Sequence, residues 1–388
     1  MSTLLHGVGP TCRPLNSSTP AGAPCIALLA KRTYVFDADG STLGPAPEQL
    51  PLRPKALHDG EPTGLLLADT EAWPYKLRTD VVVHGHVYAH GARRQVDAAV
   101  AVGAARRDLR VSGDRRCARS AYGGVHFSDP EPFDRMPLQY DRAYGGYDAG
   151  SEATQPNLFD LLAPGLSPGT DPKMYSRCCY PRNRHGRGYL LAGSSTPIDA
   201  VSLPNIEDPA DLLHPDRLVV PEPLAWWRQP VPAGTSWLHP GYLARCAYLG
   251  VRPFFQPLPE ELPEFARGYL PEGLRRVDVM GGDPLVFGVQ SGASLGLQLS
   301  GVTGGSVIRL IGMHPELREV DVVVPAQPTM IVRTRWRSAE DAPTVLHHVE
   351  LHPDDGLYTV VWRGAVEAQR GLLPEELEAL PFSVEWPS

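Results

Sequence analysis

Proline and glycine together limit what this chain can fold into. The 388-residue sequence contains 41 Pro and 38 Gly, about one residue in five, where average usage gives roughly one in eight. Proline breaks the hydrogen-bond ladder of a helix interior, and glycine weakens a helix through its backbone entropy. A helical bundle or a coiled coil is therefore excluded. Because 42% of the residues are hydrophobic and 21% are charged, a disordered chain is excluded too.

The net charge limits the classes of partner that this protein can bind, and the cysteine pattern indicates the cellular compartment. The formal net charge of -8 repels phosphate backbones and anionic lipid, so we expect no nucleic-acid partner. No stretch approaches the roughly 18 apolar residues of a spanning helix, and the first 15 residues lack the pattern of a signal peptide, so we expect no membrane insertion. The six cysteines form neither a CxxC motif nor a disulfide framework. A reduced, cytoplasmic protein is predicted.

Short alternating or β-branched runs predict strands in two parts of the chain. The runs of the first part are Ile26–Asp37, Thr79–His90, Gln95–Val102 and Asp108–Val111, of which the last three are expected to form an antiparallel meander. The runs of the last third are Val277–Met280, Pro284–Val289, Leu295–Leu299, Val307–Ile311, Val320–Val324, Met330–Trp336, Val345–Leu351 and Leu357–Trp362. Short helices are expected at Pro259–Phe265 and Pro374–Leu380, where Pro opens an acidic first turn.

These runs predict a mainly β fold of antiparallel sheets, sandwich or barrel-like, with long Pro/Gly-rich loops and few short helices. Residues 1–23 would be an N-terminal extension, 24–370 a single β-rich domain and 371–388 a C-terminal tail with a short helix. Within the domain we expect strand-rich parts at 24–128 and 276–370 around a Pro-rich irregular part at 129–275. The sequence leaves open whether the two strand-rich parts form one continuous sheet system or two sandwiches.

One motif points to a nucleophile, but its context does not. Gly292-Ala293-Ser294-Leu295-Gly296 matches GxSxG, which in hydrolases lifts a serine onto a turn between a strand and a helix. Here the residues after Ser294 alternate with period two, which favours a β-turn serine. The chain also lacks GxxxxGK[ST] and HExxH. We therefore expect a protein that is not an enzyme.

Two stretches place histidines at every second position. His84 and His86 would share one strand face, close enough to hold one metal ion, because strand side chains alternate. His348, Glu350 and His352 would share a face in the same way. If the two strands are neighbours, a His-rich zinc site forms. The sequence does not place them together, and a half-exposed strand face is the commoner outcome, so no metal and no cofactor are predicted.

Basic side chains crowd the stretch from Arg177 to Gly188. Its glycines allow close approach of a backbone, so the loop suits capture of an acidic peptide or a phosphate. Pairing with the protein's own surplus carboxylates is the favoured alternative. The adjacent Cys178 and Cys179 lack a CxxC helix start, which favours a structural role for both.

Several peptides follow one another in a fixed order along the chain. They are Trp73-Pro74-Tyr75-Lys76 leading into Thr79-Asp80-Val81-Val82-Val83, Val111-Ser112-Gly113-Asp114-Arg115, Met136-Pro137-Leu138, Tyr140 to Gly146, Asn183 with Gly186 and Gly188, Leu203-Pro204-Asn205-Ile206-Glu207, and Leu346 to Gly364. This ordered set resembles one family, the bacterial domain of unknown function 2169. The resemblance covers about residues 24–370, which correspond to one family-length domain. It departs from the family pattern at Arg184, where the family often has Pro, and is loose around Ala225 to Val251.

The resemblance implies a non-enzymatic accessory of the type VI secretion system. Such an adaptor or chaperone would bind a cognate toxin effector and help load it onto the spike protein, and the family offers no catalytic residues to carry over. A metal-dependent hydrolase using the His-rich strand face and a carbohydrate-binding β-sandwich module are the alternatives.

Trp and Arg dominate binding hot spots, so one hypothesis assigns partner binding to a tryptophan and arginine groove and to the basic loop. The alternative, which we favour for the tryptophans, is that they are core. Residues of the family motifs are expected to be scaffold whose buried charges pair, namely Trp73, Asp80, Asp114, Arg115, Tyr144, Asn205 and Glu207. The candidate partner-binding residues are Arg182, Arg184, Arg187, Trp226, Trp227, Arg228 and Trp237.

Overall fold

A computed structural model of the chain confirms a mainly β fold with mostly antiparallel sheets. The structure describes residues 5–6, 11–19, 22–37, 39–61, 63–152, 178–221, 223–239 and 290–387. Among these residues the sheets stay open and no barrel closes.

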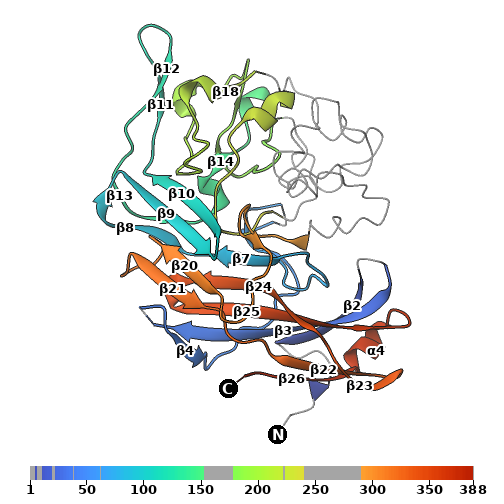
Figure 1. The fold of residues 1–388 in the computed structure, drawn as a ribbon. Helices are drawn as coiled ribbons and strands as arrows, with labels where there is room; N and C mark the ends of the chain where they lie inside the picture. Colours follow the sequence, from blue (N-terminus) through green and yellow to red (C-terminus); the bar gives the residue numbers. More distant parts are fainter. Residues whose placement is uncertain are drawn as a thin grey trace, which may run out of the picture.

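The largest sheet has seven strands and is built from both ends of the chain (Figure 1). Its long central strands β24, β25 and β3 pair antiparallel, whereas β7 pairs with β24 in parallel. The two strand-rich parts of the sequence therefore share one sheet. In spatial order the strands are β19 (Gln298–Leu299), β7 (Thr79–Val83), β24 (Thr344–His352), β25 (Leu357–Glu367), β3 (Pro24–Phe36) and β2 (Cys12–Ser18), and β4 (Thr42–Pro45) also pairs with β3.

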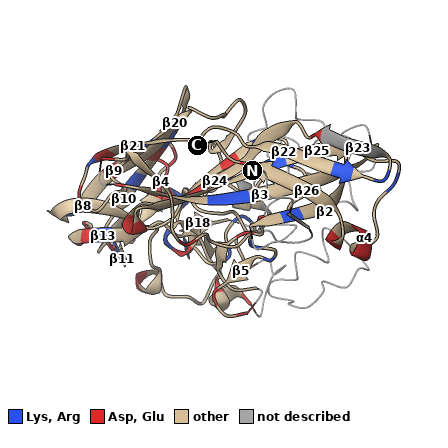
Figure 2. Cartoon of the chain, turned by 90° about the horizontal axis from the view of Figure 1, so that it is seen from below, with Lys and Arg blue, Asp and Glu red and all other residues tan. Residues whose placement is uncertain are grey.

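A five-stranded sheet packs on the same hydrophobic core, which takes residues from both sheets. Its exposed face carries ion pairs such as Arg110 with Asp97 and Arg309 with Asp321. Figure 2 shows basic and acidic residues interspersed around the labels of β9, β10, β20 and β21, at the left of the view. The strands are, in spatial order, β17 (Ile206–Glu207), β10 (Ala105–Ser112), β9 (Gln95–Val102), β20 (Val307–Ile311) and β21 (Glu319–Val323).

The remaining elements are short. A four-stranded sheet contains β1 (Leu5–His6), β26 (Pro381–Glu385), β22 (Thr329–Thr334) and β23 (Arg337–Asp341). The two-stranded pairs are β5 (Leu57–His58) with β6 (Leu66–Ala68), β8 (His86–Arg93) with β13 (Phe133–Pro137), β11 (Cys117–Arg119) with β12 (Val125–Phe127), β14 (Tyr144–Gly145) with β15 (Arg187–Gly188), and β16 (Leu190–Leu191) with β18 (Val219–Val220). The helical pieces within the described ranges are α4 (Pro374–Glu378) and the 3₁₀ turns η1 (Tyr140–Arg142), η2 (Ala149–Ser151), η4 (Ile198–Ala200), η5 (Pro215–Arg217), η6 (Pro223–Arg228) and η9 (Pro353–Asp355).

A second, smaller core lies in the Pro-rich part of the chain. It packs buried aromatic rings such as Tyr144, Tyr180 and Trp226 against aliphatic side chains of β16 and β18. Tyr180 meets Tyr144 and Trp226 edge to face, with centroids 5.1 and 6.0 Å apart, the arrangement that aromatic quadrupoles favour. Irregular backbone is thus held by aromatic packing in place of long strands.

The strand predictions were confirmed in most places. Gln95–Val102 and Val307–Ile311 are strands with the predicted bounds. The predicted run Leu295–Leu299 keeps only Gln298–Leu299, because the backbone N–H of Leu297 donates to the carbonyl of Ser294 and closes a turn. The predicted segments Pro259–Phe265, Val277–Met280 and Pro284–Val289 lie outside the described residues.

The predicted meander of Thr79–His90 with the next two strands is wrong. Gly85, with φ +105°, breaks the run into β7 and β8, a conformation that side chains with a Cβ rarely adopt. β7 then joins β24, and β8 pairs with β13, so only β9 and β10 keep the predicted antiparallel pairing. This break directs the two neighbouring histidines to different partners.

The cysteines agree with the prediction of no disulfide framework. Those of the described ranges are free and buried, namely Cys12, Cys25, Cys117, Cys178 and Cys179. In the same ranges, no helix has the length and the apolar character needed to cross a membrane.

Candidate functional site

The parallel pairing of β7 with β24 brings the two histidine stretches together. In this register Val82 lies opposite Glu350 and Val83 opposite Leu351, and the backbone N–H of His84 donates to the carbonyl of Leu351 at 2.9 Å. His84, the first residue after β7, therefore lies beside the last residues of β24. The neighbourhood on which a His-rich site depends is present.

Alternation along β24 puts His348, Glu350 and His352 on one face, as the sequence predicted. The expectation that this face is half-exposed is wrong, because His348 and Glu350 are buried. Val349 and Leu351 are fully buried in the main hydrophobic core. On the other face, the Trp237 ring meets the His348 ring edge to face at 5.5 Å, and its Nε1 lies 3.4 Å from Oε1 of Glu350. The face that carries His348 and Glu350 is thus packed against a tryptophan.

The carboxylate of Glu350 faces the ring nitrogens of two histidines at the end of this face. Its Oε1 is 2.7 Å from Nε2 of His84 and 3.8 Å from Nε2 of His352. The two rings are stacked, with centroids 5.0 Å apart and an angle of 14° between their planes. His86 does not join them, because after Gly85 its Nδ1 lies 2.6 Å from the carboxylate of Asp354, which also accepts from the hydroxyl of Tyr88.

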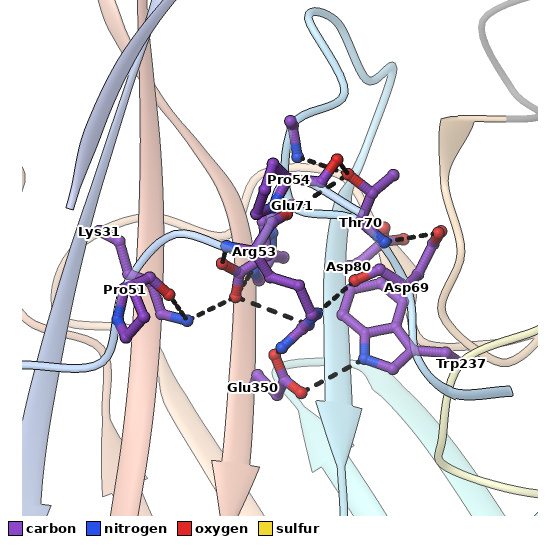
Figure 3. A network of polar contacts seen from close by, with 12 residues as sticks. Lys31, Pro51, Arg53, Pro54, Asp69, Thr70, Glu71, Asp80, Trp237 and Glu350 are labelled. Carbon is purple, nitrogen blue, oxygen red and sulfur yellow. Dashed lines mark hydrogen bonds and ion pairs between the residues drawn. The ribbon is translucent and has the colours of Figure 1, made fainter. Parts of the chain in front are cut away.

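Two cations and two carboxylates form a buried chain that ends at Glu350 (Figure 3). Lys31 Nζ lies 2.7 Å from Oε1 of Glu71, whose Oε2 accepts the backbone N–H of Arg53 at 2.6 Å. The guanidinium of Arg53 then bonds Oε2 of Glu350 at 2.9 Å. Glu71 and Glu350 are almost fully excluded from solvent. Because the four formal charges cancel, the cluster is neutral without any histidine being protonated.

The surroundings set the protonation state of these groups. Burial would raise the pKa of Glu71, but His348, Lys31 and Arg53 lower it to about 2. Burial opposes ionisation of Glu350 too, yet Arg53, His84 and His352 hold its pKa well below the usual range. Burial lowers the pKa of His348 and of His352, despite the nearby carboxylates. At pH 7 Glu71 and Glu350 are therefore carboxylates, and the rings of His348 and His352 are neutral.

A second buried pair anchors the GxSxG turn to the same sheet. Lys76 Nζ lies 2.6 Å from Oδ2 of Asp80, whose carboxylate also accepts the backbone N–H groups of Gly292 and Ala293. The buried Ser294 hydroxyl lies 2.5 Å from the hydroxyl of Tyr140. No helix follows Ser294, so the predicted turn serine is confirmed.

The predicted partner-binding residues do not form one groove among the described residues. Trp237 is fully buried in the main core near Lys76 and Glu350. Arg182 and Trp226 are buried in the smaller core, where the guanidinium lies 5.2 Å from the ring centroid. For Trp226 and Trp237 this is the core placement that the sequence favoured.

The other predicted partner-binding residues with described side chains are more exposed to solvent. Arg184 is half-buried, Arg228 is exposed at the end of η6, and the side chain of Trp227 lies outside the described residues. Arg187 is half-buried, and its guanidinium donates to Oδ1 of Asn205 at 3.1 Å. Partner binding by these residues stays a prediction.

Sequence reasoning missed the charged members of the buried chain: Lys31, Arg53 and Glu71. One signal was available, because Lys31 is one of only four lysines and follows the apolar run from Ile26 to Ala30. A cation in a buried strand needs a carboxylate partner. Nothing in the sequence identifies Glu71 or Glu350 as that partner, since both are distant along the chain.

A hairpin formed by β11 and β12 extends away from the sheets (Figure 1). Its turn is closed by the N–H of Gly123 donating to the carbonyl of Ser120, and by the N–H of Ser120 donating to the carbonyl of Gly124. Tyr122 at the tip is 100% exposed, while Cys117 at the base is buried in the smaller core. A fixed turn thus presents an aromatic ring to solvent.

Comparison with known proteins identifies one family. A family model described as "Uncharacterized protein conserved in bacteria (DUF2169)" matches residues 21–363. Neither a curated protein nor a solved structure matches the chain.

The buried chain predicts a large cost for removing one carboxylate. Glu71→Gln leaves the Lys31 ammonium buried without its anion, so we expect the free energy of unfolding to fall by about 3–5 kcal/mol. The matched control is Asp97→Asn, which breaks the exposed pair with Arg110 and should cost at most about 1 kcal/mol. Urea unfolding monitored by tryptophan fluorescence measures both. Equal costs for the two variants would contradict the assignment.

Buried histidines predict that stability falls in mild acid. The pKa of His347 and of His348 is lowered in the folded protein, chiefly by burial, so below the ordinary value of about 6.5 only the unfolded chain takes up these protons. The free energy of unfolding should fall as pH drops below 6.5, by about 1.4 kcal/mol per pH unit for each ring. In His347→Gln the slope of the free energy of unfolding against pH should be smaller by the contribution of one proton. Urea unfolding between pH 8 and pH 5 tests this. A flat profile would count against neutral buried rings.

Proposed function

Because the chain belongs to the DUF2169 family, we propose that it is a non-enzymatic accessory protein of the type VI secretion system. It acts as an adaptor or chaperone in the cytoplasm, binds a cognate toxin effector and helps load that effector onto the spike protein. The ordered set of motifs that carries the resemblance supports this proposal.

The places of the motif residues fit a protein that works by binding. Arg115 pairs with Glu207 at 2.5 Å, and the side-chain amide of Asn205 donates to Oδ1 of Asp114 at 2.9 Å. These contacts tie β17 and the segment before it to the end of β10. The motif charges thus pair with one another, as expected of scaffold residues.

The exposed tip of the hairpin is the observation that carries the choice of binding surface. A tyrosine in contact with a partner can remove roughly 150–250 Å² from water, and tyrosine is enriched among binding hot spots. Tyr122 makes such a ring available in full, on a turn already closed by hydrogen bonds. A preformed turn loses little conformational entropy on binding. We assign the first contact with the effector to this hairpin.

Co-purification tests the adaptor function and the hairpin together. We expect the product of the neighbouring toxin gene to co-purify with the wild-type protein, and Tyr122→Ser to weaken the complex at least about tenfold. Because Tyr122 is fully exposed, its replacement should change the free energy of unfolding by less than about 0.5 kcal/mol.

Leu43→Ser is the matched control, since Leu43 is 65% exposed on β4, at the opposite end of the molecule in Figure 1. It should leave toxin binding unchanged. If wild-type protein does not co-purify with the toxin and its deletion leaves toxin solubility unchanged, the adaptor proposal is wrong. If Tyr122→Ser binds like the wild type, only the assignment to the hairpin is wrong.

A further inference from the structure

Three side chains around the end of β24 have the spacing of metal ligands. His84, Glu350 and His352 each offer one ligand atom, a ring nitrogen or a carboxylate oxygen, and these three atoms all lie within 4.8 Å of one another. Zinc ligands at 2.0–2.2 Å from a tetrahedral ion are separated by roughly 3.3 Å. The separations of 2.7 and 3.8 Å from Oε1 of Glu350 to the two ring nitrogens bracket this value. Placing an ion between them requires the distance from Oε1 to His84 to lengthen and the distance from Oε1 to His352 to shorten.

The His84 nitrogen has no other use in the structure. Although its Nε2 lies 2.7 Å from Glu350, the contact lacks the geometry of a hydrogen bond, and the atom itself is shielded from solvent. A buried polar atom without a hydrogen bond costs free energy. Coordination of a cation by the ring nitrogen and the carboxylate oxygen together would remove that cost.

The carboxylate of Glu350 is held ready for such a role. Arg53 bonds Oε2, which fixes the plane of the carboxylate and leaves Oε1 directed toward the two histidines. Partners that orient a metal ligand in this way raise the affinity for the ion. Arg53 is itself balanced by Glu71, 3.6 Å away, so its charge is not left unopposed beside the site.

A second group of possible ligands shares Glu350, namely Glu71, His348 and Glu350. This group does not suit an ion. Both oxygens of Glu71 are already occupied, Oε1 by Lys31 and Oε2 by the backbone N–H of Arg53, and all three side chains are enclosed. The ion pairs of Glu71 therefore make that group structural.

The first group is open to solvent on one side. The side chains of His84 and His352 are 18% and 28% exposed, whereas that of Glu350 is 2% exposed. Because Nε2 of His84 is itself shielded, an ion reaches the three ligand atoms when these partly exposed rings rotate, and a water molecule can complete a four-coordinate shell. Two histidines, one glutamate and a water form a known ligand set for Zn²⁺.

We propose that His84, Glu350 and His352 bind one divalent transition-metal ion, with Zn²⁺ the ion that the ligand set favours. The site joins the end of β7 to the end of β24 and does not depend on the adaptor function. The matched control lies two residues away, because the ring of His86 is held by Asp354 and takes no part in the site.

Metal titration of the purified, tag-free chain tests the proposal. After treatment with EDTA and dialysis, the wild type and His86→Ala should each bind one Zn²⁺ per chain in isothermal titration calorimetry, confirmed by elemental analysis. His84→Ala and His352→Ala should bind at least about tenfold more weakly. Co²⁺ in place of Zn²⁺ should give a visible absorption band in the wild type and in His86→Ala that both ligand variants lack.

Near-ultraviolet circular dichroism shows whether each variant is folded. Both His84 and His352 are replaced, in separate variants, so that the conclusion does not depend on a single substitution. Binding of less than one ion per chain by the wild type would overturn the proposal. Unchanged stoichiometry and affinity in His84→Ala and His352→Ala would overturn it as well, because the ion would then lie elsewhere.

Discussion

The contact between Arg53 and Glu350 is the interaction on which the arrangement of this molecule depends. A carboxylate that is 2% exposed must be paired, because an isolated buried charge costs more free energy than a folded domain gains in net stability. Arg53 meets that need from a segment outside the sheet, His84 approaches from the end of β7, and Trp237 approaches from the Pro-rich part of the chain. Three distant parts of the sequence are thereby tied to one residue of β24.

The periodicity of the sequence predicted two features that depend on neighbouring residues: which side chains share a strand face, and where some strands begin and end. The alternation in β24 placed His348, Glu350 and His352 on one face, and the bounds of β9 and β20 followed from their apolar runs. The parallel pairing of β7 with β24 could not be predicted, because it joins residues more than 260 positions apart and no alternation pattern specifies a neighbour. For the same reason the sequence indicated histidine-bearing faces without showing that they meet.

The paired charges of the family motifs are separate from the exposed side chains to which we assign recognition. The family motifs supply paired charges and turns that fix the backbone, such as Arg115 with Glu207. Recognition would fall to residues outside these pairs, such as Tyr122 on its hairpin, where a change of sequence does not disturb the core. An adaptor that serves a particular client needs this separation, because its binding surface must vary while its fold does not.

A double-mutant cycle between Arg53 and Glu350 tests most directly whether the buried carboxylate depends on this guanidinium. The free energies of unfolding of the wild type, Arg53→Met, Glu350→Gln and the double variant give the coupling between the two side chains. If the dependence holds, the double variant should be more stable than the sum of the single effects predicts, by at least about 1 kcal/mol. Additive effects within about 0.5 kcal/mol would show that the two residues act independently, and would contradict the central role of this ion pair.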